Sequence, residues 1–361
     1  EAVDVLADMK VFQGYDNGKT FKPQGDITRA EVAAIVYRIY TADVKDSYVK
    51  NYETYNKFSD MAGAGWAKGY IGYCANAGLI KGYDAKTFGP SDKVTGYQAL
   101  AMILRAVGYD KNDEFTGAQW QLRVASTAQQ LGILKNVKGV DLNAAASREL
   151  VAELLFRTAA EVPMVTYTPA LGYTNLTAIL NGKTNATLGY KNFGLTKTDA
   201  TTDKWGRPLY KWTNGKTGTA LVTYATVKAT PVKTYTTAVK ECDVAHDAGL
   251  TADTAYTLYI NGDKQLAKYI VNLTDTTTQM GAQGRLVEVY DDSIVMIDTF
   301  LAKVTYVAEA TYDAQNHLKT PATITLKVYE GVTNGLNKSA TETYYTMTND
   351  KTNYEYVVGD Y

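Results

Sequence analysis

Two copies of one short segment constrain the fold of this chain more than any other feature. Residues 14–23 read GYDNGKTFKP, and residues 82–90 read GYDAKTFGP. Each copy follows an apolar turn and precedes a helix start, at Ile27–Glu31 and at Val94–Gln98. A weaker third copy lies between residues 131 and 150. Units of helix, turn-rich loop and helix cannot bury their apolar faces alone, so the pattern predicts three helical repeats that stack on one another.

The composition changes near Val162. Before this point apolar residues recur at helical spacing, for example in residues 31–39 and 149–156. After it Thr, Tyr and Val alternate with polar residues, as in residues 219–227 and 322–329, which is a strand pattern. The sequence therefore predicts a multidomain α plus β chain, with a helical part followed by a β-rich part that is sandwich- or barrel-like.

Two segments of the β-rich part carry turn signals. Residues 286–297, with the Asp291-Asp292 pair at their centre, predict a β-hairpin. Residues 203–212 predict a turn between strands, and we expect their aromatic residues to anchor a small core.

Charge and cysteine content exclude several classes of protein. The 361 residues carry a net charge of -1, which gives no reason to expect a nucleic acid or an anionic membrane as partner. The two cysteines, Cys74 and Cys242, exclude a disulfide framework and a cysteine-rich metal site. No apolar run approaches the roughly 18 residues that cross a bilayer. We interpret the start at Glu1, without a signal peptide, as a mature or trimmed form, and we expect the natural protein to continue beyond Tyr361.

The second repeat shows the fullest pattern. It begins with Phe58-Ser59-Asp60 and Trp66-Ala67, and the GYD segment follows. Together with the Ile27-Thr28-Arg29-Ala30-Glu31 helix start of the first repeat, this pattern resembles the S-layer homology (SLH) domain. The first repeat matches over the half that is present, the second departs where Gly96 replaces Arg, and the third diverges. The resemblance covers roughly residues 1 to 160.

The resemblance implies a fold and a function. Three SLH repeats in a row are the family's usual anchoring unit, which implies a helical pseudo-threefold trimer. The family binds a secondary polymer of the bacterial cell wall that often carries an acidic pyruvyl ketal. We therefore expect an extracellular S-layer or cell-surface protein, with possible self-association in a lattice and no cofactor. The expected domains are SLH repeats at about 1–45, 46–110 and 111–161, a β-rich domain at 162–302, and an incomplete second β-rich unit at 303–361.

The helix starts carry residues suited to capping. In the first, the Thr28 hydroxyl can accept a hydrogen bond from the backbone three residues on while Glu31 reaches back, which is a capping box. Thr95 and Gln98 repeat this pattern, and Ser147 can cap the third helix without a reciprocating partner.

Arg29 and Arg148 are the strongest candidates for polymer binding. Neither is needed for a cap, and a cation at a helix N-terminus opposes the helix dipole. Such an arginine suits an anion, and a guanidinium can hold a ketal carboxylate through two parallel hydrogen bonds. The alternative is an intramolecular pair with a carboxylate or a solvated side chain. Because Gly96 occupies this position in the second repeat, we expect at most two competent sites.

Four aromatic residues are further candidates. Trp66 and Trp120 can stack on a sugar ring, or they can belong to the core because both lie in helical apolar patterns. Tyr15 and Tyr83 follow a glycine in a turn, where they can line a groove or close the turn over the core.

Catalytic and metal chemistry finds little support. The short Asp16-Asn17-Gly18 turn falls below the spaced oxygen ligands that calcium needs. Residues 241–247 bring Cys242 and His246 together, but without a second Cys/His pair or an oxyanion motif we interpret them as structural or as a loop. We therefore expect no enzyme in this chain. The alternatives are a surface enzyme or an adhesin whose active part lies beyond residue 361.

Overall fold

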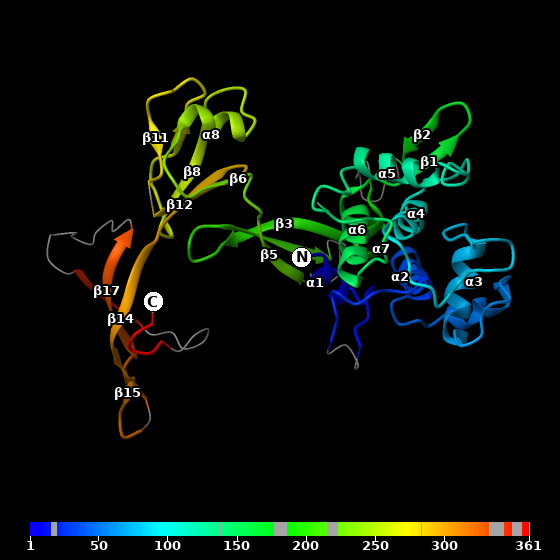
Figure 1. Ribbon diagram of the computed structural model, residues 1–361, viewed down its shortest axis with the longest axis horizontal. Helices are drawn as coiled ribbons and strands as arrows, with labels where there is room; N and C mark the ends of the chain where they lie inside the picture. The colour runs from blue at the N-terminus through cyan, green and yellow to red at the C-terminus, as the bar shows by residue number, and fades with distance from the viewer. Residues whose placement is uncertain are drawn as a thin grey trace. The chain divides into compact units, whose positions relative to one another are not determined.

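The structure is a computed structural model that describes residues 1–15, 20–137, 139–176, 186–214, 223–282, 284–315, 317–331, 343–348 and 356–360 (Figure 1). Helices dominate up to residue 161 and strands after it, so the expected α plus β composition is confirmed. The chain forms two compact units. The first comprises Glu1–Thr198 and Lys211–Val227, and the second comprises Asp199–Tyr210 and Lys228–Tyr361. None of the described helices is long and apolar enough to span a membrane.

The first unit is built from paired helices. Each repeat has a lead helix (α1, α3 or α5) and ends in a motif helix (α2, α4 or α6), which follows the loop. Short 3-10 helices, η2 and η3, precede α3. The bounds are α1 (Ala2–Asp8), α2 (Arg29–Thr41), η2 (Val49–Tyr55), η3 (Gly65–Ala67), α3 (Lys68–Asn76), α4 (Gly96–Ala106), α5 (Trp120–Gln130) and α6 (Arg148–Glu161).

The repeats pack in a closed cycle. The lead helix α3 packs on α2 and the lead helix α5 packs on α4, which are the motif helices of the preceding repeats, and α1 packs on α6. At the centre, Ile27 N donates to Ala146 O at 3.2 Å, Val94 N to Ile27 O at 3.0 Å, and Ala146 N to Val94 O at 2.8 Å. These three residues stand two positions before their motif helices, and all three are buried. One continuous apolar core therefore joins the three repeats.

Residues beyond 161 complete this unit. After α6 come the hairpin of β1 (Val165–Thr168) and β2 (Gly172–Asn175) and the helix α7 (Leu188–Phe193). Asn192 Nδ2 donates to the last-turn carbonyls of α2, Ile39 O at 2.8 Å and Tyr40 O at 2.7 Å. Trp212 packs edge-on against Phe156 of α6, with ring centroids 5.1 Å apart. These residues cover apolar surface that the repeats alone would expose.

A six-stranded mixed sheet forms the centre of the second unit. Five strands follow the order β10-β8-β13-β12-β6, and β9 pairs with β8. The predicted hairpin is confirmed, because β12 and β13 pair antiparallel with Val289 opposite Ile294. The bounds are β6 (Lys233–Tyr235), β8 (Thr254–Ile260), β9 (Asp263–Lys264), β10 (Tyr269–Val271), β12 (Arg285–Val289) and β13 (Ser293–Asp298).

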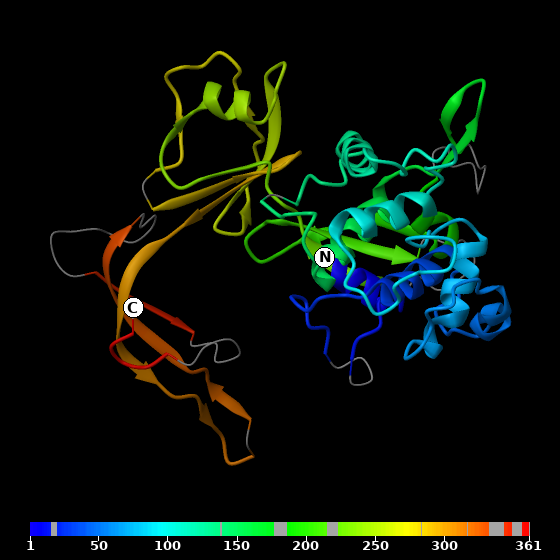
Figure 2. The same ribbon diagram turned by 45° about the vertical axis from the view of Figure 1, so that its right-hand side comes forward.

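One face of this sheet carries the helix α8 (Glu241–Asp247), which contacts the edge strand β10 (Figure 1, Figure 2). Val244 and Ala245 of α8 pack on Ile294 and Met296 of β13. The opposite face carries a smaller cluster that includes Val295, Ile297 and Trp205. The aromatic residues of the 203–212 turn therefore do not share one small core, because Trp205 and Trp212 belong to separate clusters.

The remaining strands form small separate sheets. They are β3-β4-β5, β7 with β11, β15 with β16, and β14-β17-β18. Their bounds are β3 (Leu195–Thr202), β4 (Pro208–Asn214), β5 (Thr223–Lys228), β7 (Val239–Lys240), β11 (Gln279–Met280), β14 (Phe300–Ala308), β15 (Thr311–Tyr312), β16 (Leu318–Thr320), β17 (Thr323–Gly331) and β18 (Thr343–Thr348).

Candidate functional site

The three motif helices start with side-chain caps. Thr28 and Glu31 exchange both hydrogen bonds of a capping box, and Thr95 and Gln98 do the same. Ser147 Oγ accepts from Leu150 N at 3.1 Å, with no reciprocal bond because Leu150 has no polar side chain. The caps fix where each helix begins, and so they fix the position of the residue that follows the cap.

That residue is Arg29 in the first repeat and Arg148 in the third, and both side chains are buried. Arg29 donates from Nε to Phe88 O at 2.7 Å and from Nη2 to Lys81 O at 3.0 Å. Arg148 donates from Nε to Phe21 O at 2.9 Å and from Nη2 to Gln13 O at 3.0 Å. Each arginine therefore ties its motif helix to the GYD loop of another repeat. Because both are 3% exposed, neither is the solvated arginine of the alternative interpretation.

The tyrosines of the GYD loops lie over these guanidinium groups. Arg29 Cζ is 4.4 Å from the ring centroid of Tyr83, and Arg148 Cζ is 4.6 Å from that of Tyr15. A planar guanidinium stacks favourably on such a ring face. Tyr83 remains 53% exposed, whereas Tyr15 is half-buried. Both tyrosines thus cover an arginine rather than closing over the apolar core.

The second repeat has Gly96 at the matching position, where Leu142 restricts the space for a side chain. A Cβ on Gly96 would come within 2.7 Å of Leu142 Cδ2 and 3.1 Å of Leu142 Cα. Tyr97 N donates to Leu142 O at 3.1 Å, which fixes this approach. A side chain at position 96 would therefore meet Leu142.

A groove of about 290 Å³ collects several of the predicted residues. We call it the Arg29 groove. It lies where the first motif helix, the second GYD loop, α4 and the start of α5 meet. Its lining consists of Arg29, Lys81, Gly82, Tyr83, Gln98, Ala101, Met102, Arg105, Phe115, Thr116 and Trp120. Arg29, Tyr83 and Trp120 come together here, whereas Arg148, Tyr15 and Trp66 lie elsewhere.

The described lining of this groove carries three cations and no carboxylate. Behind the lining, Asp110 is fully buried and accepts from Arg105 Nε at 2.6 Å, while Lys81 Nζ lies 3.0 Å from its Oδ2. Burial opposes ionisation of Asp110, but hydrogen bonds from Phe115 N and Arg105 hold its pKa below the usual range. Burial lowers the pKa of Arg29. Lys81 Nζ also donates to Oδ1 of the exposed Asp113 at 2.6 Å. Two carboxylates outside the lining thus neutralise part of the charge of the three cations, which leaves the groove with a cationic excess.

The two tryptophans differ in exposure. Trp66 is 56% exposed, with its ring 6.0 Å from that of Tyr70. Trp120 is half-buried at the first residue of α5, where it lines the Arg29 groove and packs against the core.

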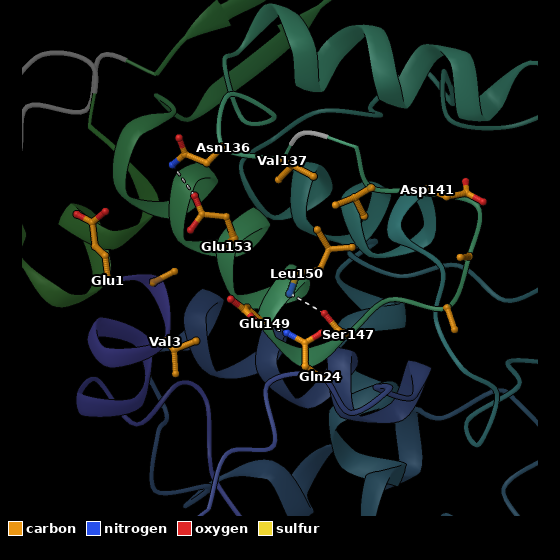
Figure 3. Close-up of a pocket in the computed structure, with 14 residues that line it drawn as sticks. Glu1, Val3, Gln24, Asn136, Val137, Asp141, Ser147, Glu149, Leu150 and Glu153 are labelled. Atoms are coloured by element: carbon orange, nitrogen blue, oxygen red, sulfur yellow. Dashed lines mark hydrogen bonds between the residues drawn. The ribbon is translucent and has the colours of Figure 1, made fainter. Parts of the chain in front are cut away.

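A second hollow of about 630 Å³ lies along α6 and has the opposite charge (Figure 3). We call it the Glu153 cavity. Its described lining includes Glu1, Asp141, Glu149 and Glu153 and no Lys or Arg. Asn136 Nδ2 donates to Glu153 Oε1 at 2.9 Å, and the two side chains point toward one another in the close-up (Figure 3). Leu150 takes the place on α6 that Gln98 has on α4.

Three residues that were not among the predicted site residues shape the Arg29 groove. Lys81 directly precedes Gly82 and Tyr83, and Arg105 lies in the last turn of α4. Asp60 accepts from Phe88 N at 3.0 Å and from Gly89 N at 2.7 Å, and so holds the second loop in place. The repeat itself could have indicated Lys81 and Asp60, since both stand in or beside the segments that define it.

The chemically versatile segment of the β-rich part is helical. Residues 241–247 form α8, and Val244 and Ala245 of this short helix belong to the apolar cluster of the sheet. His246 is exposed, and Cys242 is half-buried. Among the described residues no group of three or more His, Cys, Asp or Glu side chains could hold a metal ion. Asp16, Asn17 and Gly18 lie outside the described residues.

The helical repeats match a known family. The model of the S-layer homology domain matches residues 1–33 and 57–100, which hold Arg29 and the second GYD loop.

Three characterised proteins are similar over this part of the chain. The middle cell wall protein of Brevibacillus brevis is 28% identical over 38% of this chain and 12% of its own length. The cellulosome-anchoring protein of Acetivibrio thermocellus is 33% identical over 29% of this chain and 23% of its own length. The exoglucanase XynX of the same organism is 26% identical over 37% of this chain and 13% of its own length. The chain thus spans less than a quarter of each of these relatives. It carries S-layer homology domains and is an extracellular, cell-wall-associated protein of the bacterial cell surface.

Proposed function

We propose that the chain is a non-catalytic S-layer or cell-surface structural protein, held non-covalently on a secondary cell-wall polymer by its helical repeats. The observation that carries this proposal is the Arg29 groove, where three cations and three aromatic rings line one hollow. A polymer with an acidic substituent, such as a pyruvyl ketal, supplies the matching anion. Wall binding at this groove needs no chemical step.

We further propose that three repeats, rather than the two that the family model matches, build this anchor as a pseudo-threefold unit. The support is the cyclic contact of α1, α3 and α5 with the motif helices, together with the ring of hydrogen bonds among Ile27, Val94 and Ala146. The predicted boundaries at residues 45, 110, 161 and 302 remain predictions. So does the sandwich- or barrel-like form of the β-rich part.

The residues of the Arg29 groove would have different roles in binding the polymer. Lys81 is the most accessible of the three cations, with about a third of its side chain exposed, so it would meet the anion first. Arg29 and Arg105 are held from behind by carbonyls and by Asp110, and they would supply a fixed positive field. Tyr83 and Trp120 offer aromatic surface for the apolar face of a sugar ring.

The other predicted residues remain proposals with less support. Arg148 and Tyr15 repeat the geometry of Arg29 and Tyr83, and they would form a second site. Trp66 is exposed at the start of the second repeat and would contact the polymer there. Assembly of the β-rich part into a lattice is likewise a proposal.

An alternative proposal is a surface enzyme anchored by the same repeats. The specific observation is the similarity of this segment to part of the exoglucanase XynX. In that case the catalytic part would lie beyond residue 361. An adhesin with its active part beyond that residue remains a further prediction of the sequence.

Wall binding tests the main proposal. The full chain is mixed with purified bacterial cell wall, with and without prior removal of the secondary polymer, and the bound fraction is measured. We expect polymer-dependent binding that Lys81→Gln weakens and that the matched variant Glu149→Gln, in the Glu153 cavity, leaves unchanged. Equal binding to walls with and without the polymer would contradict the proposal.

A further inference from the structure

An unpaired hydroxyl is buried in the second unit. Ser293 is 4% exposed, and its Oγ has no hydrogen-bond partner among the described residues. Buried polar side chains are nearly always paired, because an unpaired one loses its hydrogen bonds to water without replacement. Such a group calls for a partner that is not part of the described chain.

Strand alternation shows which way Ser293 points. It starts β13, which pairs in parallel with β8 so that Ser293 lies opposite Thr257 and Val295 lies opposite Tyr259. Ile294 and Met296 pack on the side of α8, while Val295 clusters with Tyr259 on the opposite side. Because successive side chains of a strand alternate between faces, Ser293 lies on the face away from α8.

A cavity of about 550 Å³ opens on that face. Ser293 lines it, beside Thr257 and Tyr259 of β8 and the Asp291-Asp292 turn. Lys264 and the β3–β4 region complete it, so that the full described lining is Thr201, Thr202, Pro208, Leu209, Tyr210, Thr257, Tyr259, Lys264, Asp291, Asp292 and Ser293. This volume is within the range of small-molecule sites in proteins.

The walls of the cavity are held in place. Gly206 lies against Tyr259, and a Cβ at that glycine would come within 2.3 Å of Tyr259 Cγ. Thr257 N donates to Asp292 O at 3.0 Å, and Tyr290 N donates to Ser293 O at 2.8 Å. The turn that carries both aspartates is therefore fixed to β8 before any ligand arrives.

The lining mixes donors and acceptors. Lys264 donates, the exposed Asp291 and Asp292 accept, and the hydroxyls of Ser293 and Thr257 can do either. The two carboxylates outnumber the one lysine, so an anionic ligand is disfavoured. Sugar hydroxyls both donate and accept, and tyrosine offers apolar surface to the ring. We propose that this cavity binds a neutral saccharide, with Ser293 as a hydrogen-bonding residue at its base. The proposal does not rest on wall binding by the helical repeats.

Saccharide titration of the full chain tests this site. The probes are cellobiose, maltose and N,N′-diacetylchitobiose, each up to about 10 mM, above the millimolar Kd expected of a small ligand. Soluble neutral glycan fragments of the cell wall form a second arm, which separates a free sugar from a wall glycan as the source. The variants are Ser293→Ala and Asp292→Asn, with Asp263→Asn as a control that removes an equal charge outside the cavity. All titrations are repeated in the Lys81→Gln background, so that binding at the Arg29 groove is distinguished.

We expect binding in at least one arm, unchanged by Lys81→Gln and Asp263→Asn, and weakened at least about fivefold by Ser293→Ala and by Asp292→Asn. The thermal midpoint of the free Ser293→Ala chain should stay the same or rise, because the variant removes a buried hydroxyl that has no partner. Absence of binding in both arms would overturn the proposal. So would saccharide binding that both cavity variants leave unchanged, or a midpoint that falls in Ser293→Ala while binding persists.

Discussion

The Arg29 groove and the Glu153 cavity occupy comparable places in the repeat unit and differ in charge. Each lies along a motif helix, next to a GYD-type loop or its third-repeat counterpart, and near a following lead helix. The described lining of the groove has Arg29, Lys81 and Arg105, whereas that of the cavity has four carboxylates. Repetition of the backbone therefore creates the hollows, and a few side chains decide what each can bind.

The contact between repeats differs between the two places. At the groove, Arg29 reaches across to the second loop and bonds two of its carbonyls. The matching position in the second repeat is Gly96, which lies against Leu142 of the third repeat and outside the lining of the Glu153 cavity. Glycine at this position therefore goes together with a closer approach of the third repeat.

The largest expected effect is that of Arg29→Ala. It leaves the carbonyls of Phe88 and Lys81 without their partner in a buried place, so we expect a loss of about 3 kcal/mol in the free energy of unfolding. Urea unfolding measures it, and the bound fraction on cell wall is measured under conditions where the variant is folded. Wall binding should fall strongly.

Arg148→Ala is the matched control, because its hydrogen bonds are the same in kind and number. It should destabilise the chain by a similar amount while the folded variant keeps binding at the Arg29 groove. An equal loss of wall binding in both variants would show that binding does not depend specifically on the charge of the Arg29 groove.

Gly96→Ala comes next in size. Its Cβ would meet Leu142 at 2.7 Å, and we expect a destabilisation of about 2 kcal/mol despite the better helix propensity of alanine. The double variant with Leu142→Ala should destabilise the chain by less than the sum of the two single changes. A double-mutant cycle by urea unfolding measures this coupling; additive effects would show that Leu142 does not set the requirement for glycine.

Lys81→Gln should act on binding more than on stability. We expect wall binding to weaken about tenfold at low salt, since one charge contact is removed at a partly exposed site. Lys81→Arg should retain most of the affinity, and the difference between wild type and Lys81→Gln should shrink as salt rises. A salt-independent loss would point to a packing role for Lys81.

The loop at the groove should respond to acid through Asp60. Burial raises the pKa of this carboxyl, but hydrogen bonds from Phe88 N and Gly89 N hold it below the ordinary value of 3.8. A depressed pKa means that the stabilisation is present above that value and is lost as pH falls through the lower, folded-state pKa. We expect Asp60→Asn to cost about 1 kcal/mol at pH 7 and progressively less below about pH 4.

Unfolding curves from pH 7 to pH 3 measure the effect of Asp60→Asn. In the third repeat Gly117 follows Phe115-Thr116, at the position that Asp60 has in the second repeat. The loop beside the Glu153 cavity therefore lacks this carboxylate as a hydrogen-bond acceptor. A difference between Asp60→Asn and wild type that stayed constant with pH would mean that the carboxylate charge is not what holds the loop.

The smallest expected effect is a gain from Leu150→Gln. This change would give the third motif helix the capping box that Gln98 provides in the second, worth about 0.5 kcal/mol. Thermal unfolding measures it, with Ser147→Ala/Leu150→Gln as the control that removes the cap. A gain that persists without the serine would come from another source.

Much of this could be predicted from the sequence. The repeat indicated the helical part, and the residues at the caps stand where the motif helices begin, because capping depends on side chains a few positions apart. The alternation around Asp291 and Asp292 predicted the β12–β13 hairpin for the same local reason. The resemblance to the SLH family predicted that the protein is located at the cell surface.

Long-range contacts could not be predicted in this way. Arg29 was identified as an anion ligand, yet its bonds to Phe88 O and Lys81 O come from residues more than 50 positions away. Residues 241–247 are helical because their apolar side is covered by a sheet formed largely later in the chain. The sequence by itself determined the repeats, their caps and the hairpin turn. Only the tertiary structure decided which cations share a groove and which hydroxyl is left unpaired, since both depend on packing between distant segments.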